Sequence, residues 1–221
     1  MSVKTQIEYL RRTLPEGVTL VAVSKFHPVE AIREAYEAGQ RIFGESRPQE
    51  MAAKVPQLPE DIQWHMIGHL QTNKVKMIAP FVTLIHSVDS ERLVAEINRQ
   101  AERCGRTIDI LFEVHLAEDE SKSGWNIGEL REFLAGGAMG QFTHVRPRGV
   151  MTIGTLTDDI ELNKSEFRTL RSLFEELREQ FGAEFDTVSM GMTSDYSEAI
   201  ECGSTMVRIG SMIFGERDYS K

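Results

Sequence analysis

The chain has 221 residues, of which 41% are hydrophobic and 27% are charged, a composition typical of a globular protein with a sizeable core. Its 34 acidic residues outnumber its 25 basic ones, and the net charge of −9 argues against a general nucleic-acid or anionic-membrane surface. The two cysteines, Cys104 and Cys202, are far apart and form no CxxC pattern, so neither a disulfide framework nor a cysteine zinc site is expected. The sequence contains no apolar signal core and no stretch long enough to span a membrane, which predicts a cytoplasmic protein.

A strand-then-helix rhythm follows a first helix, expected over residues 2–14. Strands are expected at 19–25, 41–44, 62–67, 82–88, 108–116, 148–153, 186–190 and 205–209. Prolines, cap residues and closing glycines place the helices at 29–38, 49–55, 73–79, 91–103, from the cap Asn126 to 134, from Asp158 or Asp159 to 181, at 193–201, and from about 211. A polar loop is expected at 117–125.

These eight βα units show no composition break, linker or internal repeat. They predict an α/β fold, a single (β/α)₈ TIM barrel with an extra N-terminal helix, as one domain over residues 1–221; an open doubly wound sheet is the alternative. A barrel would place functional groups at the carboxyl ends of its strands, with a phosphate site in the loops after strands seven and eight.

Lys25 ends the first expected strand. Period-two alternation puts it on the face of Thr19, Val21 and Val23, so its ammonium group stands above small branched side chains. Burial at such a position lowers a lysine pKa and raises the neutral fraction that can attack a carbonyl. The alternative is a lysine that extends from the strand end into solvent.

Two turns after the last strands have the composition of anion sites. Residues 189–195 and 208–211 combine small residues with hydroxyls, and such turns present backbone N–H groups to a phosphate. The alternative for Thr193, Ser194, Asp195 and Ser211 is helix capping alone.

Arg208 shares strand parity with Met206 and points into the barrel mouth if Met206 faces the interior. It would face either an anion or a carboxylate such as Glu45 or Glu113. A lysine, an arginine and two phosphate turns around one mouth suggest a phosphorylated aldehyde. Pyridoxal 5'-phosphate (PLP) has an aldehyde, a phosphate and a ring nitrogen that an arginine could face.

Four histidines near strands three to five raise the alternative of a metal-dependent hydrolase: His65, His69, His86 and His115. His65 and His69 are four residues apart on a strand or its loop, and no Asp or Glu joins them at a familiar ligand spacing. Polar packing in the barrel mouth is therefore favoured, and no metal site is predicted.

Several segments together match a known family. The chain resembles the pyridoxal phosphate homeostasis protein family, single-domain relatives of the alanine racemase barrel with the type III PLP fold. The matching segments are VAVSK at 21–25, IFGE at 42–45, WHMIGHLQTNK at 64–74, IHSVD at 85–89, GVMTI at 149–153, SMGM at 189–192 and GSTMVRIG at 203–210.

The resemblance implies that Lys25 forms the internal Schiff base with PLP and that Arg208 faces the pyridine nitrogen, where it disfavours ring protonation. It implies that the phosphate is held with the help of Thr193, Gly210 and Ser211. Three residues of the matching segments complete the expected cofactor-binding set: Met151, Ser189 and Gly191.

The resemblance further implies binding and supply of PLP without substantial turnover of amino acids. Alanine racemases carry a further β domain with an opposing tyrosine base, whereas this chain ends at Lys221, shortly after the eighth strand. PLP-dependent apoenzymes are the expected recipients of the cofactor. A monomer is expected because the sequence shows no long exposed apolar stripe of the kind that forms a subunit interface. The alternatives are a PLP-dependent racemase or a Schiff-base aldolase, with Tyr196 or His69 as the second acid/base group, and a module that regulates a partner enzyme.

The chain departs from the family pattern in three places: Ser46-Arg47-Pro48 after the second strand, His115 in the fifth, and Phe26-His27 after the lysine. These departures leave the lysine, the arginine and the phosphate turns unchanged. We expect them to alter the affinity for the cofactor or its release.

Overall fold

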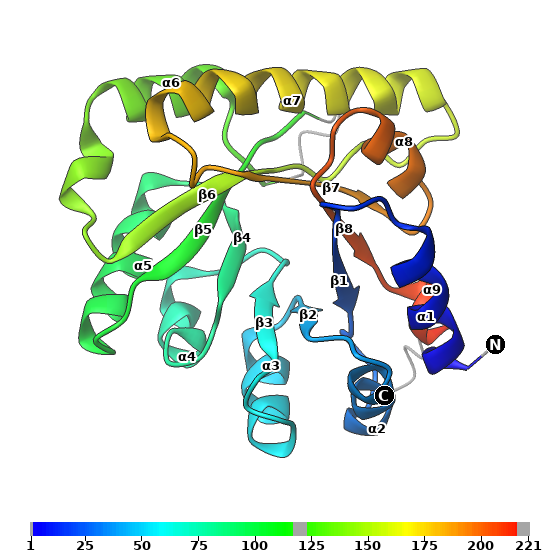
Figure 1. The fold of residues 1–221 in the computed structure, drawn as a ribbon. Helices are drawn as coiled ribbons and strands as arrows, with labels where there is room; N and C mark the ends of the chain where they lie inside the picture. Colours follow the sequence, from blue (N-terminus) through cyan, green and yellow to red (C-terminus); the bar gives the residue numbers. More distant parts are fainter. Residues whose placement is uncertain (1, 117–122, 216–221) are drawn as a thin grey trace.

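Eight parallel strands close into a barrel in the computed structural model, which describes residues 2–116 and 123–215 (Figure 1). Each strand pairs with the next, and β8 returns to β1 with Val21 opposite Arg208. The strands are β1 (Thr19–Val23), β2 (Ile42–Glu45), β3 (Gln63–Met66), β4 (Leu84–Val88), β5 (Ile108–Glu113), β6 (Val145–Met151), β7 (Thr187–Met192) and β8 (Met206–Ile209). The predicted barrel is confirmed, and the open sheet is excluded.

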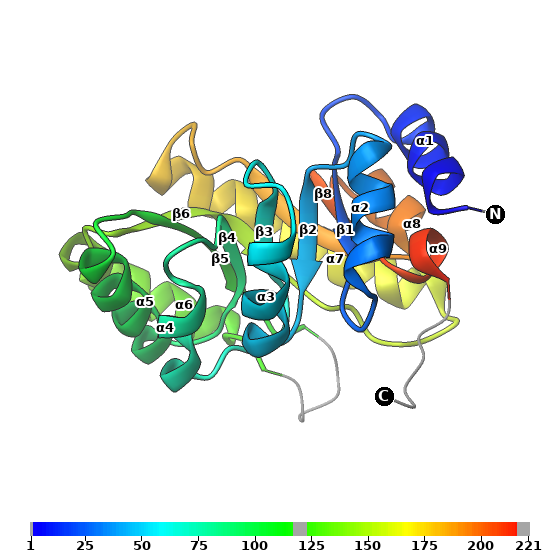
Figure 2. The same cartoon turned by 90° about the horizontal axis from the view of Figure 1, so that it is seen from below.

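Helices surround the barrel on its outside. They are α1 (Val3–Thr13), α2 (Val29–Glu37), α3 (Pro48–Lys54), α4 (Val75–Ile78), α5 (Glu91–Arg103), α6 (Ile127–Ala135), α7 (Ile160–Phe181), α8 (Tyr196–Glu201) and α9 (Ser211–Phe214), with 3₁₀ turns at η1 (Val55–Gln57), η2 (Thr72–Lys74) and η3 (Ala138–Gln141). The extra helix α1 packs on α2 and α9, and α7 crosses the top of Figure 1 over β6 and β7. Figure 2 shows α3, α4 and α5 side by side on the opposite flank. Within the described ranges, no helix has both the length and the apolar character needed to cross a bilayer.

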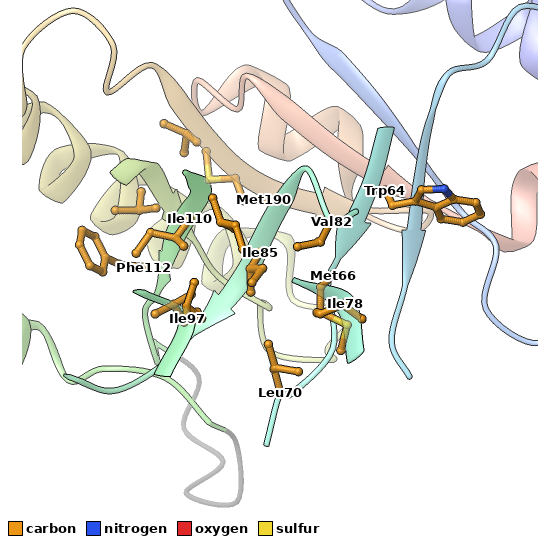
Figure 3. Close-up of a cluster of buried hydrophobic side chains, with 14 of the residues drawn as sticks. Trp64, Met66, Leu70, Ile78, Val82, Ile85, Ile97, Ile110, Phe112 and Met190 are labelled. Carbon is orange, nitrogen blue, oxygen red and sulfur yellow. The ribbon is translucent and has the colours of Figure 1, made fainter. Parts of the chain in front are cut away.

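The strands are buried on both faces, which explains their nearly continuous apolar sequences. One face packs against the helices; Figure 3 shows part of this layer, with Ile85, Ile110 and Phe112 near Ile97 of α5. The other face fills the barrel with a smaller apolar cluster formed by Val21, Leu84, Leu111, Met151 and Met206. Because Met206 faces inward, Arg208 does as well, as the strand parity predicted.

Some predicted boundaries were wrong. The expected strand 148–153 begins at Val145 and ends at Met151, although Pro147 lies within it. A shift of register opposite Ile110 and Leu111 accommodates the proline, which cannot donate a ladder hydrogen bond. The expected helix 73–79 is split between η2 and α4. The expected loop 117–125 lies largely outside the described residues, since these resume at Ser123.

The helix expected from Thr193 begins only at Tyr196, and β7 continues to Met192. The Oδ1 of Asp195 accepts a hydrogen bond of 2.5 Å from the Met192 N–H, and the Thr193 Oγ1 accepts one of 3.3 Å from the Gly210 N–H. These bonds hold residues 193–195 as a turn between β7 and α8. Thr193 therefore connects the two predicted phosphate turns to each other and does not cap a helix.

Candidate functional site

A cavity of about 300 Å³ opens at the carboxyl ends of the strands. This volume lies at the lower end of the range for small-molecule sites. The cavity is lined by Val23, Lys25, Ser46, Ile67, Ile153, Met192, Thr193, Ser194, Arg208, Gly210 and Ser211. Five of the eight predicted site residues are among them: Lys25, Thr193, Arg208, Gly210 and Ser211.

The other three predicted residues lie beside the cavity or beneath it. Met151 belongs to the apolar cluster inside the barrel, and Ser189 is fully buried under Arg208. Gly191 faces α8, since a Cβ at this position would lie 2.6 Å from the Cβ of Ala199. Their contact with a cofactor stays a prediction, since none of the three is among the residues that line the cavity.

Further lining residues were not singled out from the sequence. Ile67 and Ile153 are the last residues of two expected strands, 62–67 and 148–153, and they supply apolar walls with Met192. A rule that takes the final inward residue of every strand would have found them. Ser46 was noted only as a departure from the family pattern.

Lys25 lies beyond the end of β1, in a four-residue turn. The Ser24 carbonyl accepts a hydrogen bond of 3.1 Å from the His27 N–H, which closes the turn, and Phe26 has a positive φ of 66°. Lys25 is half-buried and borders the cavity. The cavity thus receives a primary amine from the turn that follows β1, the strand that pairs with β8.

Arg208 is 5% exposed and donates two hydrogen bonds within the barrel. Its Nη1 donates to Ser189 Oγ at 2.7 Å, and its Nη2 donates to the Thr152 carbonyl at 2.9 Å. Burial lowers the pKa of Arg208 to about 10, against the opposing effect of Asp195 and Glu113, so the guanidinium stays charged near neutral pH.

Pairing of Arg208 with Glu45 or Glu113, the alternative expected from the sequence, is wrong. In the described ranges no ion pair joins Arg208 to Glu45 or Glu113, and Glu45 pairs with Lys54 at 2.8 Å. Nor does any carboxylate side chain lie among the described residues that line the cavity. The described residues that line the cavity include two basic side chains, Lys25 and Arg208, which suits an anionic ligand.

Two histidines continue the polar contacts inward from Arg208. His86 Nδ1 lies 3.1 Å from Ser189 Oγ, and His86 Nε2 lies 3.0 Å from His65 Nδ1. Burial lowers the pKa of His65 to about 3 and is the largest cause that lowers that of His86, so both rings are neutral. Because Arg208 can only donate, the Ser189 hydroxyl is free to donate to His86 Nδ1, and His86 then donates through Nε2–H to His65. The pair is satisfied polar packing, as favoured from the sequence.

The remaining histidines do not join this pair. His69 is exposed, with its Nδ1 3.2 Å from Asp89 Oδ2, and His115 is half-buried near the start of the undescribed segment. Over residues 2–116 and 123–215, no group of three or more His, Cys, Asp or Glu side chains is placed to hold a metal ion.

Glu113 is a buried carboxyl at the end of β5 that the sequence suggested only as a partner of Arg208. Burial, with a contribution from Asp89, raises its pKa to about 7, while Arg208 and Ser123 act in the opposite direction. Neither Glu113 nor the two candidate second bases, Tyr196 and His69, is among the residues that line the cavity.

Two departures from the family pattern contact each other. The guanidinium carbon of Arg47 lies 4.5 Å from the centroid of the Phe26 ring, in a cation–π arrangement. His27 stacks on Phe214 of α9 with ring centroids 5.0 Å apart. The residues that follow Lys25 are therefore packed against β2–α3 on one side and α9 on the other.

Comparisons with known proteins agree with this geometry. The family model for the alanine racemase N-terminal domain matches residues 2–218. A pyridoxal phosphate homeostasis protein of Pasteurella multocida is 40% identical over 212 residues, which cover 94% of this chain and 90% of that protein. Alanine racemase of Streptomyces coelicolor matches 96% of this chain and 57% of its own with a TM-score of 0.76, and at 19% identity it shows the shared fold alone.

Solved structures of PipY from Synechococcus elongatus PCC7942 are similar along their whole length. The structure without PLP has a TM-score of 0.91 at 38% identity and covers 97% of this chain and 100% of PipY. The structure with PLP bound has a TM-score of 0.89 over the same shares. Together with the near-complete family match, these similarities show that the chain belongs to the pyridoxal phosphate homeostasis protein family, built on the barrel of the alanine racemase N-terminal domain.

Proposed function

We propose that this protein binds PLP in the cavity and holds it as a Schiff base on the Nζ of Lys25, in the service of PLP homeostasis. The observation that carries the proposal is the meeting of Lys25, Arg208 and the hydroxyls of Thr193, Ser194 and Ser211 around one cavity. PipY, with PLP bound in a barrel of the same shape, supports it.

The chemistry of the cavity fits this cofactor. Three hydroxyls on the turns after β7 and β8 are hydrogen-bond donors suited to a phosphate, and Ile67, Ile153 and Met192 offer apolar contact to a flat ring. Bound PLP would supply an aldehyde that condenses with a primary amine to form a C=N bond, with release of the aldehyde oxygen as water, and Lys25 is the described lining residue that has such an amine. We also propose that the binding domain spans residues 1–221.

The same residues favour a carrier over an enzyme. Arg208 keeps its charge and already donates to Ser189 and Thr152, so it is a poor acceptor for a ring proton. Apart from Lys25 and Arg208, the described lining residues carry no titratable acid or base. We therefore propose that PLP is held without substantial turnover of amino acids and passed to PLP-dependent apoenzymes, in the cytoplasm, by a monomer.

Absorbance of the purified protein with added PLP, followed by borohydride reduction, tests the proposal. Wild type should develop a visible imine band and, after reduction, retain the cofactor covalently on Lys25. Lys25→Ala should lose both signals, whereas Lys76→Ala, which removes an exposed lysine on α4, should keep them. The absence of a band in wild type, or covalent trapping that persists in Lys25→Ala, would refute the Schiff base. Rapid racemisation of an amino acid by the loaded protein would overturn the carrier role.

A further inference from the structure

The turn that carries Lys25 has a conformation that needs support. Ser24 is fully buried, and its N–H donates to the Gly44 carbonyl at 3.0 Å, so the turn begins on the edge of the barrel. The next residue but one, Phe26, has a φ of 66°. A positive φ is uncommon for a bulky residue other than glycine and persists only where neighbouring contacts hold it.

One buried ammonium group and two carboxylates supply such contacts. We call Lys54, Glu45 and Glu50 the Lys54 cluster. The Nζ of Lys54 donates to Glu45 Oε1 at 2.8 Å, to Glu50 Oε1 at 2.7 Å and to the Ser24 carbonyl at 2.9 Å. These three bonds use every hydrogen of the ammonium group.

The two carboxylates of the Lys54 cluster bind the residues on either side of Lys25. Glu45 Oε1 accepts a hydrogen bond of 2.6 Å from the Ser24 hydroxyl, and Glu50 Oε1 accepts one of 2.6 Å from the Phe26 N–H. The backbone before and after Lys25 is thus tied to one charged group. This arrangement restricts the directions in which the Lys25 side chain leaves the chain.

The location of the Lys54 cluster makes a purely stabilising role a poor explanation. Lys54 is 7% exposed and Glu45 is 0% exposed, and buried ion pairs often stabilise a fold no better than apolar residues of the same size. Glu45 Oε2 is buried and has no hydrogen-bond partner among the residues that the structure describes. The free-energy cost of burying Lys54 and Glu45 is easier to explain if their charges fix the geometry of the turn that carries Lys25.

The Lys54 cluster also belongs to the unit that borders the Lys25 turn. Glu45 ends β2, and Glu50 and Lys54 are separated by one helical turn in α3. Arg47 lies in the sequence between Glu45 and Glu50, and its guanidinium stacks on the Phe26 ring. The β2–α3 segment therefore contacts the turn through both its buried and its exposed residues.

We propose that the Lys54 cluster is a positioning device for Lys25: it holds the turn so that the lysine amine is presented to the aldehyde in the cavity. The inference rests on the proposed Schiff base. It predicts that damage to the cluster weakens imine formation and leaves the non-covalent recognition of the phosphate nearly unchanged, because the phosphate turns lie on β7 and β8.

Two ligands separate these effects. PLP reports imine formation plus recognition, and pyridoxine 5'-phosphate, which has an alcohol in place of the aldehyde, reports recognition alone. Glu50→Ala removes the acceptor of the Phe26 N–H and should weaken PLP binding about tenfold, the effect of one partly buried hydrogen bond to a charged group. Its affinity for the alcohol should stay within about twofold of wild type. Glu50→Gln keeps an acceptor oxygen and should lose less than Glu50→Ala.

Matched variants complete the experiment. Glu201→Ala breaks the solvent-exposed pair with Lys164 and should change neither affinity, because such pairs contribute little. Lys54→Met would leave two carboxylates unpaired and is unsuitable, since it endangers folding. If Glu50→Ala melts far below wild type, Ser24→Ala takes its place, since it removes the bond to Glu45 alone and should shift PLP affinity in the same direction.

The outcomes are distinct. Equal losses for PLP and for the alcohol, or no loss for either ligand, would overturn the positioning role while the wild-type imine stands. A wild type without an imine band would overturn the proposed function, and the positioning role with it. A selective loss for PLP, partly restored in Glu50→Gln, is the result that supports the inference.

Discussion

The guanidinium of Arg208 and the hydroxyl of Ser189 are joined at 2.7 Å inside the barrel, directly beneath the cavity. Ser189 also contacts His86, which contacts His65, so polar side chains from β8, β7, β4 and β3 form one continuous chain. A charged residue is thereby kept within a closed barrel without a carboxylate partner among the described residues. The contacts of Arg208 and of His65 can each be tested through the free energy of unfolding.

Replacement of Arg208 by lysine tests its two hydrogen bonds. A single ammonium on a different geometry cannot reproduce the fork that reaches both Ser189 Oγ and the Thr152 carbonyl. We expect Arg208→Lys to lower the free energy of unfolding in urea by about 1–3 kcal/mol, the effect of leaving a buried group unsatisfied. Arg131→Lys, in an exposed pair with Glu176, should be nearly neutral; an equal effect of both variants would argue against the buried contacts.

The buried histidines predict a loss of stability in acid. The pKa of His65 falls from 6.5 to about 3 on folding, so its neutral form is favoured in the folded state. The associated stability is complete above pH 6.5 and declines as the pH falls towards 3, by up to about 1.4 kcal/mol per pH unit.

A substitution that cannot titrate isolates this effect. His65→Gln keeps an acceptor for His86, and its unfolding free energy should fall less steeply than that of wild type between pH 6 and pH 5, by roughly 1 kcal/mol. His69→Gln replaces a histidine whose side chain is 59% exposed and should follow the wild-type slope. Parallel curves for wild type and His65→Gln would show that His65 is protonated in the folded state.

Glu113 predicts the opposite pH dependence. Its pKa rises from 4.5 to about 7 on folding, so the stability linked to its neutral form is present below pH 4.5 and is lost as the pH rises through 7. Glu113→Gln should therefore gain roughly 2–3 kcal/mol relative to wild type at pH 8 and little at pH 5, measured by urea unfolding. Glu132→Gln changes an exposed carboxyl of α6 and should show no such difference; a gain for Glu113→Gln that is the same at both pH values would contradict the buried titration.

At Gly149 the paired strands β6 and β7 are too close together for any side chain. A Cβ at this position would lie 1.7 Å from the Thr187 carbonyl oxygen, so the paired strands must move apart to accept it. Gly149→Ala should destabilise the protein by at least about 3 kcal/mol or prevent soluble expression. Gly140→Ala, where a Cβ meets nothing within 4 Å, is the control, and similar melting temperatures for the two variants would refute the close approach.

All eight expected strands are present, with ends shifted by a few residues. Hydrophobic periodicity and the positions of glycine and proline are local signals, and they sufficed for the element order. Pro147 shows the limit of such signals. It lies directly before the expected strand 148–153, yet the register shift between β5 and β6 admits it into β6, and that shift depends on the neighbouring strand.

The sequence by itself determined the barrel, the inward direction of Arg208, and the residues that follow the strand ends, which include Lys25 and the two turns at the cavity. These could be predicted because strand parity follows from backbone geometry, and because a parallel barrel carries its functional groups at the carboxyl ends of its strands. Only the tertiary structure decided which partners these residues have. Lys54 is the clearest case: at the end of a short helix it looks like a solvent-exposed residue, but it lies 2.9 Å from the Ser24 carbonyl. No local pattern encodes that contact, since it depends on how α3 packs against the end of β1. The partners of Arg208 and the pairing of His65 with His86 depend in the same way on strands that meet only when the barrel closes.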